Sequence, residues 1–195
     1  MRIDAIVMAS GQSKRMGMNK LFIEFRGKKL YEYTLDLMKA LQKEALLDAV
    51  VVVSSYEEIL EGARRRNLTA LSNPNAEVGK SASIKLGVEA CNTDAALMFF
   101  VADQPLLTKE TCQALIESFR EKGQMTFPCV GKRRGAPVIF PPEFREKLWN
   151  LTEDQGGMIF AKDHPTNPVS IADERELLDI DTHEAYTELK EEANE

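Results

Sequence analysis

The chain has 195 residues, a hydrophobic fraction of 44% and a formal net charge of −6 at pH 7. This length suits one domain with a substantial core, so we take residues 1–195 as a single domain. The acidic balance argues against sequence-independent nucleic-acid binding, which needs many Lys and Arg contacts to phosphate. No apolar run approaches membrane-spanning length and nothing resembles a signal peptide, so we expect no membrane contact and a cytoplasmic protein.

The first predicted strand is the apolar run at residues 5–9, which breaks into a small-residue loop. From there helical and strand patterns alternate. Helices are predicted at residues 30–41, 57–66, 84–91 and 108–119, and strands at 49–54, 68–71 and 95–102. Buried strands without polar alternation, separated by helices, indicate an α/β fold whose mostly parallel sheet is covered on both faces.

Beyond residue 123 the pattern changes to shorter elements around a basic tip at residues 131–135. Pro142 suits the first turn of a helix that extends to Leu151. Thr182 is predicted to cap a charged terminal helix. Short strands are predicted at residues 125–130, 136–140, 169–171 and 177–180.

The three cysteines, Cys91, Cys112 and Cys129, are odd in number and widely spaced, without a C-x-x-C pair. We therefore expect reduced thiols rather than disulfides. His164 and His183 have no Cys or His neighbour at ligand spacing, so the sequence predicts no zinc site.

The loop after the first strand carries the strongest chemical signal: it reads Ser-Gly-Gln-Ser-Lys-Arg-Met-Gly-Met-Asn-Lys over residues 10–20. Glycines, serines and three cations at the carboxyl end of a strand indicate a phosphate-binding loop, because backbone N–H groups and positive side chains point outward there. The glycine spacing matches neither the dinucleotide fingerprint nor the Walker A loop. The alternative interpretation is an ordinary polar turn, which is common after a strand.

Two acidic positions are predicted at the same edge of the sheet as this loop. Asp103 follows a buried strand, and Asp181 follows a late apolar pair. Carboxylates from different strand ends can converge on one hard divalent cation. Taken alone, Asp103 also suits a turn before Pro105, and Asp181 a helix start beside Thr182.

Residues 8–20 resemble the signature Leu-Ala-Ala-Gly-x-Ser-x-Arg-Met-Gly-x-x-Lys of MobA-like nucleotidyltransferases. Within that family the chain is most similar to the molybdenum cofactor cytidylyltransferase branch. Residues 102–105 (Ala-Asp-Gln-Pro) resemble its Gly-Asp-Gln-Pro, and residues 179–182 match its Asp-Ile-Asp-Thr ending. Residues 134–138 (Arg-Gly-Ala-Pro-Val) and 153–157 (Glu-Asp-Gln-Gly-Gly) resemble its Arg-Gly-x-Pro-Val and Gly-Asp-x-Gly segments, so the likeness covers nearly the whole chain.

The resemblance implies a Rossmann-like, three-layer nucleotidyltransferase fold and a Mg²⁺-dependent reaction that releases pyrophosphate. It implies catalytic roles for Arg15, Lys20 and Asp103, with Asp103 and Asp181 as metal ligands. The implied nucleotide-binding residues are Ala9, Ser10, Gly11, Gln12, Ser13, Lys20, Asn73, Gly79, Ser81 and Ser83. The implied acceptor-binding residues are Arg134, Gly135 and Asp154. Two local alternatives stay open: residues 73–83 as a turn and helix cap, and the Arg133–Arg134 tip as a solvated hairpin.

Three residues depart from the family pattern: Ser10 and Ala102 stand where Ala and Gly are usual, and Glu153 stands where Gly precedes Asp154. Ser10 adds a hydroxyl near the expected phosphates. Ala102 keeps the turn if its φ is negative. Glu153 places a second carboxylate beside Asp154.

The leading hypothesis is transfer of CMP from CTP, the favoured nucleoside triphosphate, to the phosphate of molybdopterin or molybdenum cofactor. One alternative keeps the chemistry with GTP or another phosphorylated acceptor. A second is a non-catalytic protein that binds the cofactor and delivers it to a molybdenum hydroxylase. Retention of both Lys20 and Asp103 favours an enzyme, because binding alone does not need a metal ligand and a leaving-group cation.

Overall fold

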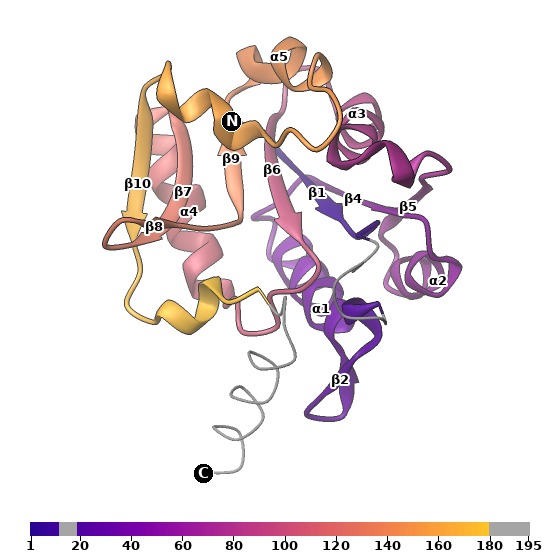
Figure 1. Cartoon of the computed structure of the whole chain (residues 1–195). Coiled ribbons are helices and arrows are strands. Elements are labelled where there is room, and N and C mark those ends of the chain that lie inside the picture. The colour runs from indigo at the N-terminus through magenta and orange to yellow at the C-terminus, as the bar shows by residue number, and fades with distance from the viewer. Residues whose placement is uncertain (12–18, 180–195) are drawn as a thin grey trace.

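The structure is a computed structural model that describes residues 1–11 and 19–179. Figure 1 shows a central sheet with helices on both sides. The strands are β1 (Ile3–Met8), β2 (Glu24–Phe25), β3 (Lys28–Lys29), β4 (Ala49–Ser54), β5 (Thr69–Ser72), β6 (Ala96–Val101), β7 (Met125–Val130), β8 (Arg133–Arg134), β9 (Val138–Phe140) and β10 (Thr166–Ser170). The α-helices are α1 (Leu30–Lys43), α2 (Glu57–Arg65), α3 (Lys80–Ala90), α4 (Lys109–Lys122) and α5 (Arg145–Trp149).

The main sheet has the strand order β10-β7-β9-β6-β1-β4-β5 in the described part of the chain, and β8 pairs with β7. β6, β1, β4 and β5 are parallel neighbours. β9 is antiparallel to both β6 and β7, whereas β10 is parallel to β7. The predicted mostly parallel sheet is confirmed. Its parallel half consists of β6, β1, β4 and β5, and it includes the strand that precedes the basic loop.

Both faces of β1, β4 and β6 are buried, which explains why these strands lack polar alternation. Val50 and Val52 of β4 pack in a core beneath α1, α2 and α4. Val51 and Val53 face the opposite way, into a core covered by α3 and α5. Alternating side chains thus serve two hydrophobic layers, and the predicted three-layer arrangement follows. Among the described residues, no helix has the length and apolarity needed to cross a bilayer.

The later part of the chain was harder to predict. Pro142 opens a 3-10 turn, Pro142–Phe144, and α5 ends at Trp149 before reaching Leu151. The strand predicted at 177–180 is wrong for its described residues, because Glu174–Leu177 forms a 3-10 turn followed by irregular chain. Thr182 and its predicted terminal helix lie outside the described residues.

The predicted N-cap at Thr108 is confirmed, and it has a partner that sequence patterns did not indicate. Thr108 Oγ1 accepts a hydrogen bond from the backbone N–H of Thr111 at 3.2 Å. Glu176 Oε2 in turn accepts from the Thr108 N–H at 2.9 Å and from its hydroxyl at 2.7 Å. The 3-10 turn that contains Glu176 is therefore fixed to the start of α4.

The cysteines are all free thiols, as expected, and two of them, Cys91 and Cys112, are buried. Burial raises the pKa of the Cys91 thiol to about 12 and raises the pKa of the Cys112 thiol strongly as well. Since the thiolate is the reactive form, both are expected to resist a disulfide reagent in the native protein, while half-buried Cys129 reacts first. Titration with a chromogenic disulfide before and after denaturation checks this. Prompt labelling of all three native thiols would contradict it.

Candidate functional site

The carboxyl ends of four parallel strands form the edge at which several of the predicted site residues lie. Met8 is aligned with Val101 of β6 on one side and with Val53 of β4 on the other. Ser10 comes two residues after Met8, and Asp103 comes two residues after Val101. They therefore leave the sheet from neighbouring strands, which are about 5 Å apart. In open α/β sheets this edge is where ligands bind.

Ala9 and Ser10 are held by β4. The Ala9 N–H donates to the Val53 carbonyl at 2.8 Å, and Ser54 Oγ donates to the Ala9 carbonyl at 2.8 Å. Ser10 Oγ also donates to the Val53 carbonyl, at 3.3 Å. The extra hydroxyl of Ser10 therefore fastens the loop to the sheet.

Gly11 is exposed, and a Cβ built on it would meet no atom within 4 Å. Its carbonyl accepts from the Tyr56 hydroxyl at 3.2 Å. Sequence reasoning missed both Ser54 and Tyr56 as loop supports. A serine that ends a run of four valines was the available signal. Gln12, Ser13 and Arg15 lie outside the described residues.

Lys20 and Asp103 meet at this edge. Lys20 begins a 3-10 turn, Lys20–Phe22, whose N-cap Asn19 accepts from the Leu21 N–H at 3.1 Å. Its Nζ forms an ion pair with Asp103 Oδ2, and the two side chains are only 14% and 11% exposed. The predicted cation and the predicted metal ligand are thus brought together in a poorly hydrated place, where their electrostatic interactions are strong.

One carboxylate oxygen of Asp103 has no hydrogen-bond partner among the described residues. Its Oδ1 is buried and has no hydrogen-bond partner within residues 1–11 and 19–179, and the same is true of Gln104 Oε1. A buried acceptor without a partner is costly and suggests a missing ligand. An anionic oxygen in this state fits a hard cation such as Mg²⁺.

The described residues contain no group of three or more His, Cys, Asp or Glu that could hold a metal ion. That composition still suits Mg²⁺, which is commonly held by one or two carboxylates together with water and substrate phosphates. Asp181, the second predicted ligand, lies outside the described residues.

Two of the predicted nucleotide-binding residues after β5, Asn73 and Ser83, are hydrogen-bonded to each other. Asn73 is 1% exposed, and its Nδ2 donates to Ser83 Oγ at 3.0 Å. Its Oδ1 accepts from the Asn75 N–H at 3.0 Å. Ser81 is also buried. These side chains build the turn into α3.

Gly79 lies where this turn meets a distant segment. Its φ of +112° belongs to a region that side-chain-bearing residues rarely adopt. A Cβ there would lie 2.7 Å from Asp154 Oδ1 and 2.7 Å from the carbonyl group of Glu153. The Glu153 carbonyl accepts from the Ser81 N–H at 2.9 Å. The structure therefore places Asp154, a predicted acceptor-binding residue, beside the predicted nucleotide-binding turn.

Glu153 itself has φ +51°, in the left-handed region. The family pattern has glycine at this position, and the positive φ supplies the physical reason. This chain makes the same turn with a non-glycine residue.

The other two predicted acceptor-binding residues belong to a different group of contacts. Arg134 is exposed and lies over the Phe127 ring at 5.4 Å. A Cβ on Gly135 would lie 2.6 Å from Leu177 Cδ2, and Arg133 donates to the Leu177 carbonyl at 2.7 Å. The basic tip is therefore packed against the segment that leads to Asp179.

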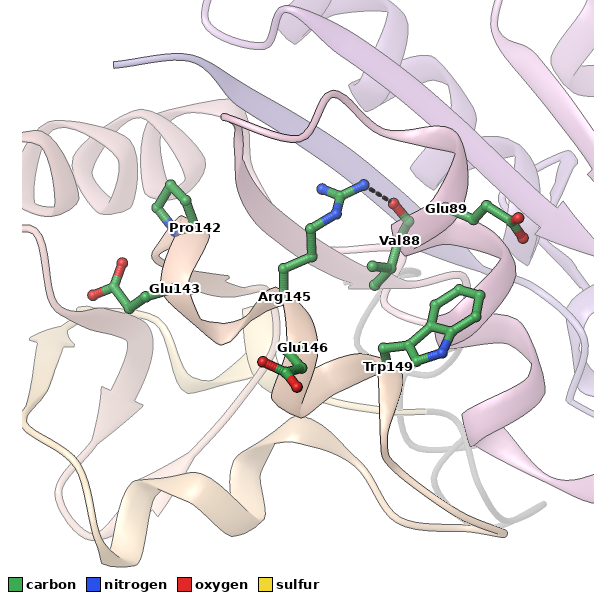
Figure 2. Close-up of a pocket in the computed structure, with 7 residues that line it drawn as sticks. All are labelled: Val88, Glu89, Pro142, Glu143, Arg145, Glu146 and Trp149. Atoms are coloured by element: carbon green, nitrogen blue, oxygen red, sulfur yellow. Dashed lines mark hydrogen bonds between the residues drawn. The ribbon is translucent and has the colours of Figure 1, made fainter.

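A groove of about 530 Å³ lies away from this edge, between α3 and α5. Figure 2 shows Arg145 reaching from α5 to the Val88 carbonyl near the end of α3. Arg145 also donates to the carbonyls of Cys91 at 2.7 Å and Asn92 at 2.9 Å. The groove adjoins the carboxyl end of α3, opposite the Gly79 end, so it is separate from the candidate site. Its lining residues are Val88, Glu89, Pro142, Glu143, Arg145, Glu146 and Trp149.

Residues 5–168 match the MobA-like NTP transferase domain. The molybdenum cofactor cytidylyltransferase of Escherichia coli (strain K12) is 27% identical, over 97% of this chain and 96% of that protein. The molybdenum cofactor guanylyltransferase of Shewanella sp. (strain MR-4) is 26% identical, over 78% of this chain and 76% of that protein.

The solved structure of Rv0371c from Mycobacterium tuberculosis H37Rv superposes with a TM-score of 0.83 at 20% identity, covering 97% of both chains. A manganese complex of the same protein superposes with a TM-score of 0.79 at 18% identity, covering 98% of this chain and 99% of that one. These likenesses confirm the predicted nucleotidyltransferase fold. Together with the family match over most of its length, they establish that this chain is a nucleotidyltransferase of the MobA-like NTP transferase family.

Proposed function

We propose that the protein transfers CMP from CTP to the terminal phosphate of a molybdopterin-type acceptor, with Mg²⁺, and releases pyrophosphate. The observation that carries the proposal is the Lys20–Asp103 ion pair at the carboxyl ends of the parallel strands, with Asp103 Oδ1 left without a partner among the described residues. A cation and a metal-binding oxygen at one place suit the triphosphate, because nucleotidyl transfer depends on charge neutralisation and positioning.

In the proposed reaction an oxygen of the acceptor phosphate attacks the α-phosphorus of the nucleotide. The new P–O bond forms as the bond to the β-phosphate oxygen breaks, and pyrophosphate leaves with that electron pair. Lys20 would neutralise charge on the leaving group, and Asp103 would hold the metal ion. When bound, Mg²⁺ supplies further neutralisation of the triphosphate.

The cytidylyl preference is supported by the branch motifs at residues 102–105 and 134–138 and by the E. coli relative, which covers nearly the whole chain. A guanylyl preference is the second candidate, because the Shewanella relative has a similar identity. The manganese complex of Rv0371c supports a divalent ion as cofactor. Delivery of the product to a molybdenum hydroxylase belongs to the same proposal.

The proposal is tested by measuring binding of CTP, GTP, ATP and UTP in the presence of Mg²⁺, followed by pyrophosphate release with a molybdopterin-type acceptor. We expect CTP to bind most tightly and to support release. Release with GTP alone would replace the cytidylyl assignment by the guanylyl one. Tight cofactor binding without pyrophosphate release from any nucleotide would leave only a delivery role.

Replacing Lys20 by methionine is expected to weaken Mg²⁺–triphosphate binding by about 10- to 100-fold, because one charge-assisted contact is lost from a poorly hydrated site. The length of the side chain is roughly kept. Lys39→Met, at an exposed position of α1, is the matched control and should bind nucleotide like the wild type. Equal affinities in the two variants would assign Lys20 a purely structural role.

A further inference from the structure

The predicted nucleotide-binding residues of the turn after β5 have few side-chain groups left with which to recognise a ligand. Asn73 and Ser83 are buried and hydrogen-bonded to each other, and Ser81 is 1% exposed. Gly79 has no side chain at all. At Gly79 itself, recognition by a side chain therefore needs a group that another segment places against it.

Asp154 is the group that the fold brings there. Its residue is exposed, its Oδ1 lies against Gly79, and its carboxylate has no ion pair or hydrogen bond within the described part of the chain. The turn that carries it is fixed at two places. Gln155 Oε1 accepts from the Thr152 N–H at 3.1 Å, and the Glu153 carbonyl accepts from the Ser81 N–H at 2.9 Å. Asp154 is thus an accessible hydrogen-bond acceptor on a turn that is held in place by hydrogen bonds.

The position of Asp154 along the edge suits the base of a nucleotide. Asn73 follows β5, which lies two strands from β1 in the order β1-β4-β5. Two strand spacings amount to about 10 Å. A nucleotide whose phosphates lie at Lys20 and at Ser10, after β1, extends along the edge through its ribose, and its base then reaches the turn at Gly79.

We propose that Asp154 selects the nucleotide by accepting a hydrogen bond from an exocyclic amino group of the base. This inference rests on the proposed function and adds a determinant of base preference to it. A carboxylate pairs well with the amino group of cytosine, whereas uracil presents a carbonyl oxygen at the same position and is repelled. Amino-bearing bases are therefore favoured over uracil.

The test compares CTP and UTP binding, with Mg²⁺, to the full-length wild type and to Asp154→Asn. Asparagine has nearly the same shape, and its amide can turn to donate to the carbonyl of uracil. We expect the wild type to prefer CTP and the variant to lose about tenfold or more of that preference. Asp163→Asn, also at an exposed position, removes the same charge and should keep the wild-type ratio.

The ratio of the two affinities separates base recognition from other effects. Loss of a general repulsion of triphosphate, or of a favourable charge at the start of α3, changes both affinities equally and leaves the ratio unchanged, which would overturn the inference. Equal binding of CTP and UTP by the wild type would also overturn it, while leaving nucleotidyl transfer intact. Absence of all nucleotide binding in the wild type would instead overturn the proposed function.

Discussion

Replacing Asp103 by asparagine is expected to lower the rate of pyrophosphate release by about two to three orders of magnitude. The substitution removes the anionic oxygen that has no partner, and it removes the charge that pairs with Lys20. Binding of Mn²⁺ as a probe, measured by electron paramagnetic resonance in the presence of nucleotide, should weaken in parallel. Circular dichroism checks that the variant remains folded.

Asp94→Asn is the matched control for this prediction. Asp94 is exposed and precedes β6, whereas Asp103 follows the same strand, so the two substitutions make the same chemical change at opposite edges of the sheet. The control should release pyrophosphate at the wild-type rate. Wild-type turnover of Asp103→Asn with Mg²⁺ would remove Asp103 from the catalytic group.

Replacing Gly79 by alanine is expected to lower the free energy of unfolding by about 2 kcal/mol or more and to weaken nucleotide binding about tenfold. Two causes combine. The φ of +112° is unfavourable for alanine, and its Cβ would lie 2.7 Å from backbone atoms of Glu153. The turn carrying Asp154 is then pushed away from α3. Denaturant unfolding and nucleotide titration measure the two effects.

Gly123→Ala separates these causes. Gly123 also has a positive φ, +62°, but a Cβ there would meet no atom within 4 Å. Only the backbone cost of about 1–2 kcal/mol is expected, with unchanged nucleotide affinity. If the two variants lose the same stability and both keep full affinity, the contact between Gly79 and the Glu153 backbone has no functional importance.

Strands β1, β4 and β6 of the parallel half could be predicted because they contain continuous apolar runs. The run at residues 49–54 matches β4, and Thr108 caps α4 as expected. Short elements were harder to predict from the sequence. The hairpin of β2 and β3 pairs only Glu24–Phe25 with Lys28–Lys29, so no periodic pattern marks it. The apolar pair Leu177–Leu178 indicated a strand, yet tertiary contacts to Arg133 and Gly135 hold a 3-10 turn and its end there instead.

The candidate site was predictable where residue chemistry and strand position coincide. Asp103 and Lys20 were both expected at the edge, and they form an ion pair there. Contacts between distant segments were not predictable. The hydrogen bond between Ser81 and the Glu153 carbonyl joins positions far apart in sequence through a backbone atom, which any residue type provides. The motifs therefore predicted an acceptor-binding role for Asp154 and a nucleotide-binding role for Gly79, although the two residues are neighbours in space.

Residues 145–153 hold helix α3 at both ends. Arg145 donates to the Cys91 carbonyl at the end of the helix, and the Glu153 carbonyl accepts a hydrogen bond from the Ser81 N–H in its first turn. Exchange of residues 73–90 between relatives would separate the helix from both anchors. Recombinants designed to change nucleotide preference therefore need to move residues 73–90 and 145–154 together. These two segments are contiguous in space and separate in sequence.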